Sequence, residues 1–211
     1  MLERINVMDP TLIDRLNRLW TPIYPHLADW IAPWCPERSG RVLELGPFSG
    51  GISAAIRKKR PEMTPVCLLR EGHLLPHLRQ AFPKVGAWVI GELSQPPFQA
   101  AFDLVVFRGA FFFLTPAMLP GIFDVLRPGG QALIGGGFGP LTPKEQIDPI
   151  AGESRELNYR LGKKWISRDE LEGMLAVAAI PPDAATILES GGLWLLVHRT
   201  GPRAARIDDG L

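Results

Sequence analysis

The sequence has little of what marks several classes of protein. Its 211 residues hold two cysteines, Cys35 and Cys67, whose spacing indicates neither a disulfide framework nor a metal centre. The net charge is +1, without a long basic run or acidic tail, so nothing favours nucleic-acid binding. The apolar run 104–107 is broken by Arg108, and such runs are far shorter than a membrane span. We therefore expect a cytoplasmic protein that keeps its cysteines reduced and contacts neither nucleic acid nor membrane.

The N-terminal part of the chain is amphipathic. Residues 10–34 carry apolar positions at helical spacing, and Pro22 and Pro25 divide them into two helices. Charged and apolar residues alternate from the first residue onward, which is unlike a signal or transit peptide. The tail 200–211 lacks apolar periodicity, so we expect it to be loosely ordered.

From residue 41 onward, short apolar runs alternate with helical patterns, which is typical of a mostly parallel sheet covered on both faces. The final two apolar runs, 185–189 and 193–198, are separated by Ser-Gly-Gly, which predicts an antiparallel hairpin at one edge. The Gly/Pro-rich segment 137–164 is long for a plain connection, so we expect a lid or substrate loop there. Ser167 and Glu170 form a capping-box pattern before a helix. The expected strands are 41–45, 65–69, 86–90, 102–107, 131–135, 185–189 and 193–198, and the expected helices between them include 50–60, 73–82 and 115–126.

The stretch Val-Leu-Glu-Leu-Gly-Pro-Phe-Ser-Gly-Gly at 42–51 ends the first strand in an acid and a glycine-rich turn. Glycines at such a turn let the backbone approach a ligand at the electropositive start of the next helix. Two more acids, Glu71 and Glu92, follow the second and third strands. In doubly wound sheets, ligands bind at these strand ends, and an acid after the second strand can accept hydrogen bonds from a ribose diol.

Together these residues resemble the class I S-adenosylmethionine-dependent methyltransferases, over about residues 40–199. Glu44, Gly46 and Gly50 match that family's first loop, and the segment from Gly91 to Phe98 resembles its adenine loop. Phe-Asp-Leu-Val-Val at 102–106 and Leu-Arg-Pro-Gly-Gly at 126–130 match its fourth strand and the turn before its fifth. The resemblance implies a doubly wound α/β fold, a Rossmann-like, mostly parallel seven-stranded sheet with an antiparallel last strand, preceded by N-terminal helices.

The resemblance also implies a domain organisation and a cofactor, S-adenosylmethionine. Residues 40–199 would form the cofactor-binding domain, and the helical segment 1–39 would be a cap over a small-molecule substrate. Glu71, with Arg70 as the competing position, would hold the ribose. Glu92 or the Leu93 backbone would contact adenine, and Glu44 would reach the amino group. The expected cofactor-binding residues are Glu44, Gly46, Pro47, Phe48, Ser49, Gly50, Glu71, Glu92, Leu93 and Arg108.

Phe48 departs from the family pattern, which has a glycine at this position. Its ring would lie beside the methionine moiety or the substrate, fill core space beneath the loop, or occupy the place of the cofactor. The same loop disfavours a nicotinamide-linked oxidoreductase, because it lacks the second glycine that lets a pyrophosphate approach.

No catalytic residue is evident, and methyl transfer needs a general base only when the acceptor is not already nucleophilic. The candidates are Arg108, which could pair with a substrate anion or be a surface cation, and Tyr24, His26 and Tyr159. His73 and His77 lie four apart, but no third ligand is evident, so we expect no metal. The tip Phe-Arg-Gly-Ala-Phe-Phe-Phe at 107–113 is unlike Asn-Pro-Pro-Tyr, which argues against methylation of amino groups in nucleic acid and glutamine.

We therefore expect a methyltransferase that acts on oxygen, nitrogen or carbon of a small molecule, and a homodimer would be compatible with this function. The alternative is a non-catalytic protein of the same fold that binds S-adenosylmethionine, S-adenosylhomocysteine or a partner.

Overall fold

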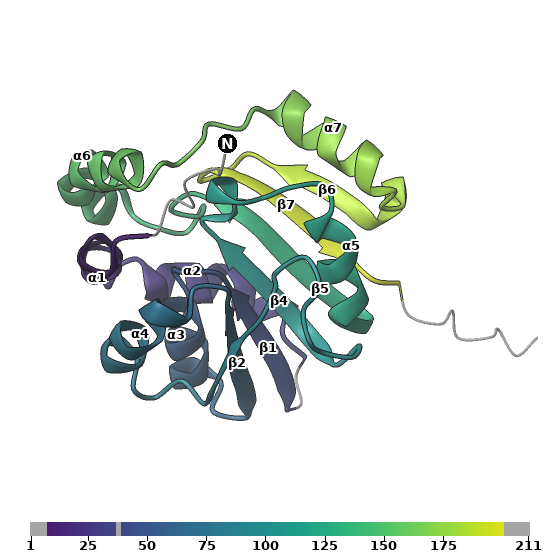
Figure 1. Ribbon diagram of the computed structural model, residues 1–211, viewed down its shortest axis with the longest axis horizontal. Helices are drawn as coiled ribbons and strands as arrows, with labels where there is room; N and C mark the ends of the chain where they lie inside the picture. The colour runs from purple at the N-terminus through teal and green to yellow at the C-terminus, as the bar shows by residue number, and fades with distance from the viewer. Residues whose placement is uncertain (1–7, 37–38, 201–211) are drawn as a thin grey trace, which may run out of the picture.

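The computed structural model describes residues 8–36 and 39–200, so the expected tail lies outside the described residues apart from Thr200. A single seven-stranded sheet forms the centre of the molecule, in the order β3-β2-β1-β4-β5-β7-β6 (Figure 1). The strands are β1 (Gly40–Leu45), β2 (Met63–Leu69), β3 (Ala87–Ile90), β4 (Phe102–Arg108), β5 (Leu126–Gly136), β6 (Ala185–Leu188) and β7 (Leu193–His198).

The sheet confirms the predicted topology. β1 pairs in parallel with β2 and β4, while β7 runs antiparallel to both β5 and β6. The closing hairpin therefore forms one edge, as predicted from the short gap between the last two apolar runs. The chain order reverses between β1 and β4, the place where open α/β sheets bind ligands at their carboxyl ends.

Helices cover both faces of the sheet, and a separate apolar cluster lies between the sheet and the helices on each face. α2 packs on α3 on one side, and α5 contacts α7 on the other, whereas α6 lies beside α1 at the periphery (Figure 1). The helices are α1 (Pro10–Leu19), α2 (Tyr24–Ile31), α3 (Gly51–Lys59), α4 (Leu75–Ala81), α5 (Met118–Val125), α6 (Lys144–Arg160) and α7 (Arg168–Ala178), with 3₁₀ turns at Ala32–Trp34, Gly72–Leu74, Ala110–Phe112 and Pro182–Ala184.

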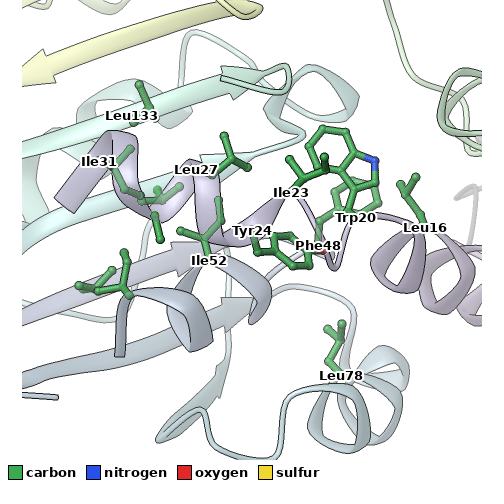
Figure 2. Packing of buried hydrophobic residues seen from close by; sticks show 14 of the residues in the cluster. Leu16, Trp20, Ile23, Tyr24, Leu27, Ile31, Phe48, Ile52, Leu78 and Leu133 are labelled. Atoms are coloured by element: carbon green, nitrogen blue, oxygen red, sulfur yellow. The ribbon is translucent and has the colours of Figure 1, made fainter. Parts of the chain in front are cut away.

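β4 shows how the strand period places the functional side chains. Leu104 and Val106 belong to the cluster under the N-terminal helices, whereas Val105 and Phe107 belong to the cluster under α5 and α7. Because side chains alternate between faces, Arg108 at the end of the strand points toward the N-terminal helices. Figure 2 shows this side of the core, where Trp20 and Tyr24 lie close to Phe48.

Two expectations for the second half of the chain need correction. The fifth strand begins at Leu126, not at 131, and a register shift between its pairs Phe102–Leu126 and Leu104–Gln131 accommodates Pro128 and the glycines. The segment 137–164 holds the 17-residue helix α6, which contains Pro149. Buried Ile150, Ser154 and Leu157 lie on one face of that helix, and this spacing outweighs the Gly/Pro content that predicted a loop.

The other local predictions hold. Pro22 and Pro25 do lie between and at the start of two N-terminal helices. α7 begins at a capping box, in which the Ser167 hydroxyl accepts from the Glu170 N–H and the Glu170 carboxylate accepts from the Ser167 N–H. None of the helices in the described part of the chain is long and apolar enough to cross a membrane.

Candidate functional site

The glycine-rich loop after β1 is a fully buried, tightly bonded turn. Gly46 has φ +88°, and a Cβ on it would lie 2.8 Å from the Phe107 ring. Ser49 donates its hydroxyl to the Gly46 carbonyl at 2.7 Å. Gly50, with φ +111°, is the N-cap residue before α3, and any side chain on it would meet the Phe82 ring. Only glycine suits both positions, because each combines positive φ with a close neighbour.

Glu44 holds this loop to the start of α3. Its Oε2 accepts from the backbone N–H groups of Gly50 and Ser53, both at 2.9 Å, so the carboxylate lies at the electropositive end of the helix. The side chain is 1% exposed, and its Oε1 has no hydrogen-bond partner. Burial raises the pKa of Glu44, although the bonds from Ser53 and Gly50 and the charge of Arg108 oppose that rise.

This raised pKa predicts a pH dependence. A carboxyl that holds its proton more tightly when folded stabilises the protein below its ordinary pKa of 4.5, and this stabilisation is lost as the pH rises through the folded-state pKa. The wild type should therefore lose stability relative to Glu44→Gln as the pH rises from 4.5, by up to about 1.4 kcal/mol per pH unit. Urea unfolding of both proteins between pH 4 and 8 would measure the difference.

Glu62→Gln is the matched control, because Arg60 lowers the pKa of Glu62. Its charged form stabilises the fold at neutral pH and is lost as the pH falls, which is the opposite sign. A stability difference between wild type and Glu44→Gln that stays constant over this pH range would contradict the prediction.

Arg108 is a buried cation surrounded by aromatic rings. Its guanidinium carbon lies 4.7 Å from the ring centre of Trp20, 5.3 Å from that of Tyr24 and 5.2 Å from that of Phe48. Its Nη2 donates to Asn17 Oδ1, the Tyr24 hydroxyl and the Phe48 carbonyl, all neutral, at 3.1–3.2 Å. The side chain is 4% exposed, its Nε has no partner, and no carboxylate among the described residues lies within ion-pair distance. Arg108 is thus not a surface cation.

Phe48 is buried, with 1% of its surface exposed. Its ring lies 5.1 Å from that of Phe112 and presses on Gly109, where an added Cβ would come within 2.5 Å of Phe48 Cδ2. The ring therefore fills the space between the glycine loop and the end of β4, and one side of it borders a cavity.

That cavity has a volume of about 550 Å³ and lies over the carboxyl ends of β4 and β5. α6 and the residues after it form the opposite wall, and Trp20 from the end of α1 closes one side. The lining comprises Trp20, Phe48, Arg108, Gly109, Phe112, Gly136, Gly137, Phe138, Ala151, Gly152, Ser154, Arg155, Glu156, Asn158, Tyr159, Lys163 and Trp165.

The residues assigned to the nucleoside lie outside this cavity. Glu71 follows β2 and accepts from the Arg70 guanidinium at 2.8 and 3.0 Å through Oε1, while its buried Oε2 has no partner. Arg70 in turn lies 5.7 Å from the centre of the Phe113 ring. After β3, the Glu92 side chain is exposed, whereas Leu93 is buried in the cluster under α5. Pro47 and Ser49 are buried within the loop itself.

The catalytic candidates Tyr24, Tyr159 and His26 differ in burial and in their position relative to the cavity. Tyr24 is buried, and burial raises its pKa to about 12, so the phenol stays protonated and donates to Asn17 Oδ1 at 2.8 Å. Tyr159 lies at the cavity rim with 82% of its surface exposed. His26 is half-buried on α2 and lines no described cavity.

His73 and His77 each bond to the N-terminal segment, at Met8 O and Asp14 Oδ2, rather than facing a common ligand. Within residues 8–36 and 39–200, no group of three or more His, Cys, Asp or Glu side chains could hold a metal ion.

The sequence reasoning missed Trp20, Phe138 and Lys163 as cavity residues. Trp20 and Phe138 stack with ring centres 4.8 Å apart and planes inclined by 12°. The Trp20 indole donates to Ser154 of α6 at 2.9 Å, which ties the N-terminal helices to α6. The apolar periodicity of α6 could have revealed the helix. The contact between α6 and the end of α1, however, cannot be read from the sequence near either segment.

Comparisons with known proteins identify solved structures that share the fold of this chain. No protein-family model and no curated protein sequence matches the chain. Among solved structures, a proposed S-adenosyl-L-methionine-dependent methyltransferase from Methanococcus maripaludis superposes with a TM-score of 0.71 at 24% identity, covering 92% of this chain and 94% of that one. A TehB-like methyltransferase from Corynebacterium glutamicum gives 0.57 at 19% identity, covering 91% and 100%.

An O-methyltransferase family 2 protein from Planctomyces limnophilus, solved with apigenin, gives 0.59 at 16% identity, with 90% of this chain covering 61% of that one. The superposition on the Methanococcus maripaludis protein is consistent with the seven-stranded mixed sheet, whose antiparallel β7 was predicted from the closing hairpin. The chain therefore has the Rossmann-like fold of the class I S-adenosylmethionine-dependent methyltransferases.

Proposed function

We propose that the protein transfers a methyl group from S-adenosylmethionine to an oxygen, nitrogen or carbon atom of a small molecule. One observation carries the proposal: among the buried polar side-chain atoms without hydrogen-bond partners, three belong to residues at or just after the carboxyl ends of β1, β2 and β4, and a fourth comes from α1 beside Arg108. They are Glu44 Oε1, Glu71 Oε2, Arg108 Nε and Asn17 Nδ2. Buried polar groups normally have partners, so these atoms are available to a polar ligand that binds at this edge of the sheet.

The chemistry of these atoms fits an amino-acid nucleoside. Glu71 Oε2 would accept from the ribose diol, Glu44 Oε1 from the amino group, and the Arg108 guanidinium would donate to the carboxylate. The chain around Glu92 and Leu93 would contact adenine. When bound, S-adenosylmethionine supplies a sulfonium-activated methyl group.

The cavity beside Arg108 would receive the acceptor. Methyl transfer is an in-line displacement in which the acceptor's lone pair forms the new bond while the sulfur keeps the electrons of the broken one. The chain mainly has to align the acceptor and exclude water, which the aromatic walls of the cavity would do. A phenol with a pKa of about 12 is a poor base at neutral pH, so Tyr24 would not act as a general base. It would instead position Arg108, whose guanidinium donates to the Tyr24 hydroxyl.

The N-terminal helices would act as the substrate cap. Trp20 closes the cavity, while Asn17 and Tyr24 bond to Arg108, so α1 and α2 complete a site whose other walls belong to the residues after 40. A volume of about 550 Å³ lies within the range of small-molecule sites. The apigenin bound by the Planctomyces limnophilus protein is an acceptor-sized compound of the kind such a cavity could hold.

Calorimetric titration with S-adenosylhomocysteine tests the cofactor. The wild type should bind saturably, and Glu71→Gln should weaken binding about 10-fold or more, because one acceptor of the ribose diol becomes a donor. Glu189→Gln serves as the control, since Glu189 is also paired with an arginine but lies far from the loop, between β6 and β7. Absence of saturable binding by the wild type would refute the proposal.

Turnover separates the enzyme from the non-catalytic alternative. Release of S-adenosylhomocysteine from S-adenosylmethionine in the presence of small aromatic acceptors would support methyl transfer. Binding without release across such a panel would instead favour a cofactor-binding protein of the same fold. Binding of NAD in place of S-adenosylhomocysteine would indicate an oxidoreductase.

A further inference from the structure

The cavity wall contributed by the segment after β5 carries a net positive charge. Arg155 and Lys163 both line it, and neither has an ion-pair partner among the described residues. Glu156 is the one acid in the lining, against three cations when Arg108 is included. Lys163 is half-buried, and its Nζ lies 3.8 Å from where a Cβ on Gly136 would be, so the ammonium reaches over the end of β5.

The environment of Lys163 favours an anion. Burial lowers its pKa, and the nearby charge of Arg108 lowers it further. Lys163 and Arg108 face the same cavity and repel each other, and a bound anion would relieve that repulsion. Trp165 approaches Lys163 with its ring centre 5.9 Å from Nζ, but a ring does not neutralise the charge.

The same cavity presents flat rings on several sides. Trp20, Phe112 and Phe138 form its inner part, while Tyr159 and Trp165 stand at the rim with 82% and 85% of their surfaces exposed. A contiguous exposed apolar patch marks a ligand- or partner-binding surface, and these two rings line the same cavity opening. Both rings belong to the same opening as Lys163, so one ligand could cover them and reach the cation.

We infer that the acceptor is an aromatic carboxylate, whose ring lies among Trp20, Phe112 and Phe138 and whose carboxylate pairs with Lys163, beneath Tyr159 and Trp165. That the ligand is the methyl acceptor rests on the proposed function. The site for an aromatic carboxylate is argued from the cavity alone. Arg108 would remain with the cofactor, because it bonds to the loop at Phe48 and lies on the face that carries Glu44.

Calorimetric titration with 2-naphthoate, in saturating S-adenosylhomocysteine, tests the inference. Two matched probes isolate its parts: 2-naphthamide keeps the rings without the charge, and cyclohexanecarboxylate keeps the charge without the aromatic ring. The wild type should bind 2-naphthoate about 10-fold more tightly than either probe, because each lacks one charged or stacking contact. Equal binding of 2-naphthoate and 2-naphthamide, or no binding of 2-naphthoate, would overturn the inference.

Lys163→Gln should weaken 2-naphthoate binding about 10-fold and leave 2-naphthamide binding unchanged. Lys164→Gln is the matched control, because Lys164 is the neighbouring exposed lysine and does not line the cavity. Quenching of tryptophan fluorescence by 2-naphthoate should also fall in Trp165→Leu.

A parallel titration with S-adenosylhomocysteine alone keeps the two proposals separate. If Lys163→Gln weakens S-adenosylhomocysteine binding but not 2-naphthoate binding, the lysine serves the cofactor and the inference is wrong, while the proposed function stands. If the wild type binds 2-naphthoate but not S-adenosylhomocysteine, the aromatic-acid site stands and the proposed function fails.

Discussion

Arg108→Met is expected to weaken S-adenosylhomocysteine binding about 30-fold to 700-fold, the equivalent of about 2–4 kcal/mol for losing a buried, charged hydrogen-bond donor to a carboxylate. Binding of 5′-methylthioadenosine, which lacks the amino-acid group, should change less than about 3-fold. The difference between the two ligands would assign Arg108 to the carboxylate of the cofactor rather than to the loop's general shape.

The same substitution should change the free energy of unfolding by less than about 1 kcal/mol. Arg108 is buried without a carboxylate within ion-pair distance, so its desolvation is offset only by neutral acceptors and aromatic faces. Removing the charge also removes its desolvation cost, and this offsets the loss of its hydrogen bonds to neutral acceptors. Tyr24 keeps its bond to Asn17 in the variant, which limits the loss. If the fold does not depend on the charge of Arg108, binding of the cofactor carboxylate would explain why the charge is buried there.

Arg41→Met is the matched control, because Arg41 also lies over a phenylalanine ring, at 5.0 Å from the centre of Phe102, but on the opposite end of β1. It should leave the binding of both ligands unchanged. Equal weakening of S-adenosylhomocysteine and 5′-methylthioadenosine in Arg108→Met, or destabilisation by more than about 3 kcal/mol, would mean that Arg108 is structural.

The strand-end residues of the site could be predicted from sequence, because a parallel sheet converts spacing along the chain into position. Glu44, Glu71 and Arg108 each follow an apolar run, and the carboxyl ends of β1, β2 and β4 meet at one edge. The position of the hairpin followed from the length of its gap. The roles of these residues toward a cofactor remain predictions.

The cap and the cavity could not be predicted, because they depend on contacts between distant segments. Trp20 bonds to Ser154 across 134 residues, and nothing near either residue in the sequence specifies the pair. Likewise, the pattern in 107–113 left open whether Arg108 was buried, since burial comes from α1 and α2 folding over it. Pro149 and the glycines concealed α6, although the spacing of its buried residues was present.

Phe48→Ala is expected to cost about 3–5 kcal/mol of unfolding free energy, the usual loss when a fully buried phenylalanine is truncated. That is a large part of the stability of a typical domain. Because the Phe48 ring supports Gly109 and Arg108, and its carbonyl accepts from Arg108, the truncation should also weaken S-adenosylhomocysteine binding, about 10-fold. Phe48→Leu keeps most of the volume and should lose less of both, which provides a folded variant if alanine is not tolerated.

Phe102→Ala separates the loss of stability from the effect on binding. Phe102 is equally buried, lies 5.1 Å from a second ring as Phe48 does, and has an arginine over its face, but it belongs to the cluster under α5. Urea unfolding should show similar losses for both alanine variants, whereas calorimetry should show weaker S-adenosylhomocysteine binding only for Phe48→Ala. Tighter binding by Phe48→Ala or Phe48→Leu would mean that the ring occupies the place of the cofactor. In that case the Phe48 side chain, and not the nucleoside, would fill the space that a glycine at this position would keep open. The non-catalytic alternative would follow.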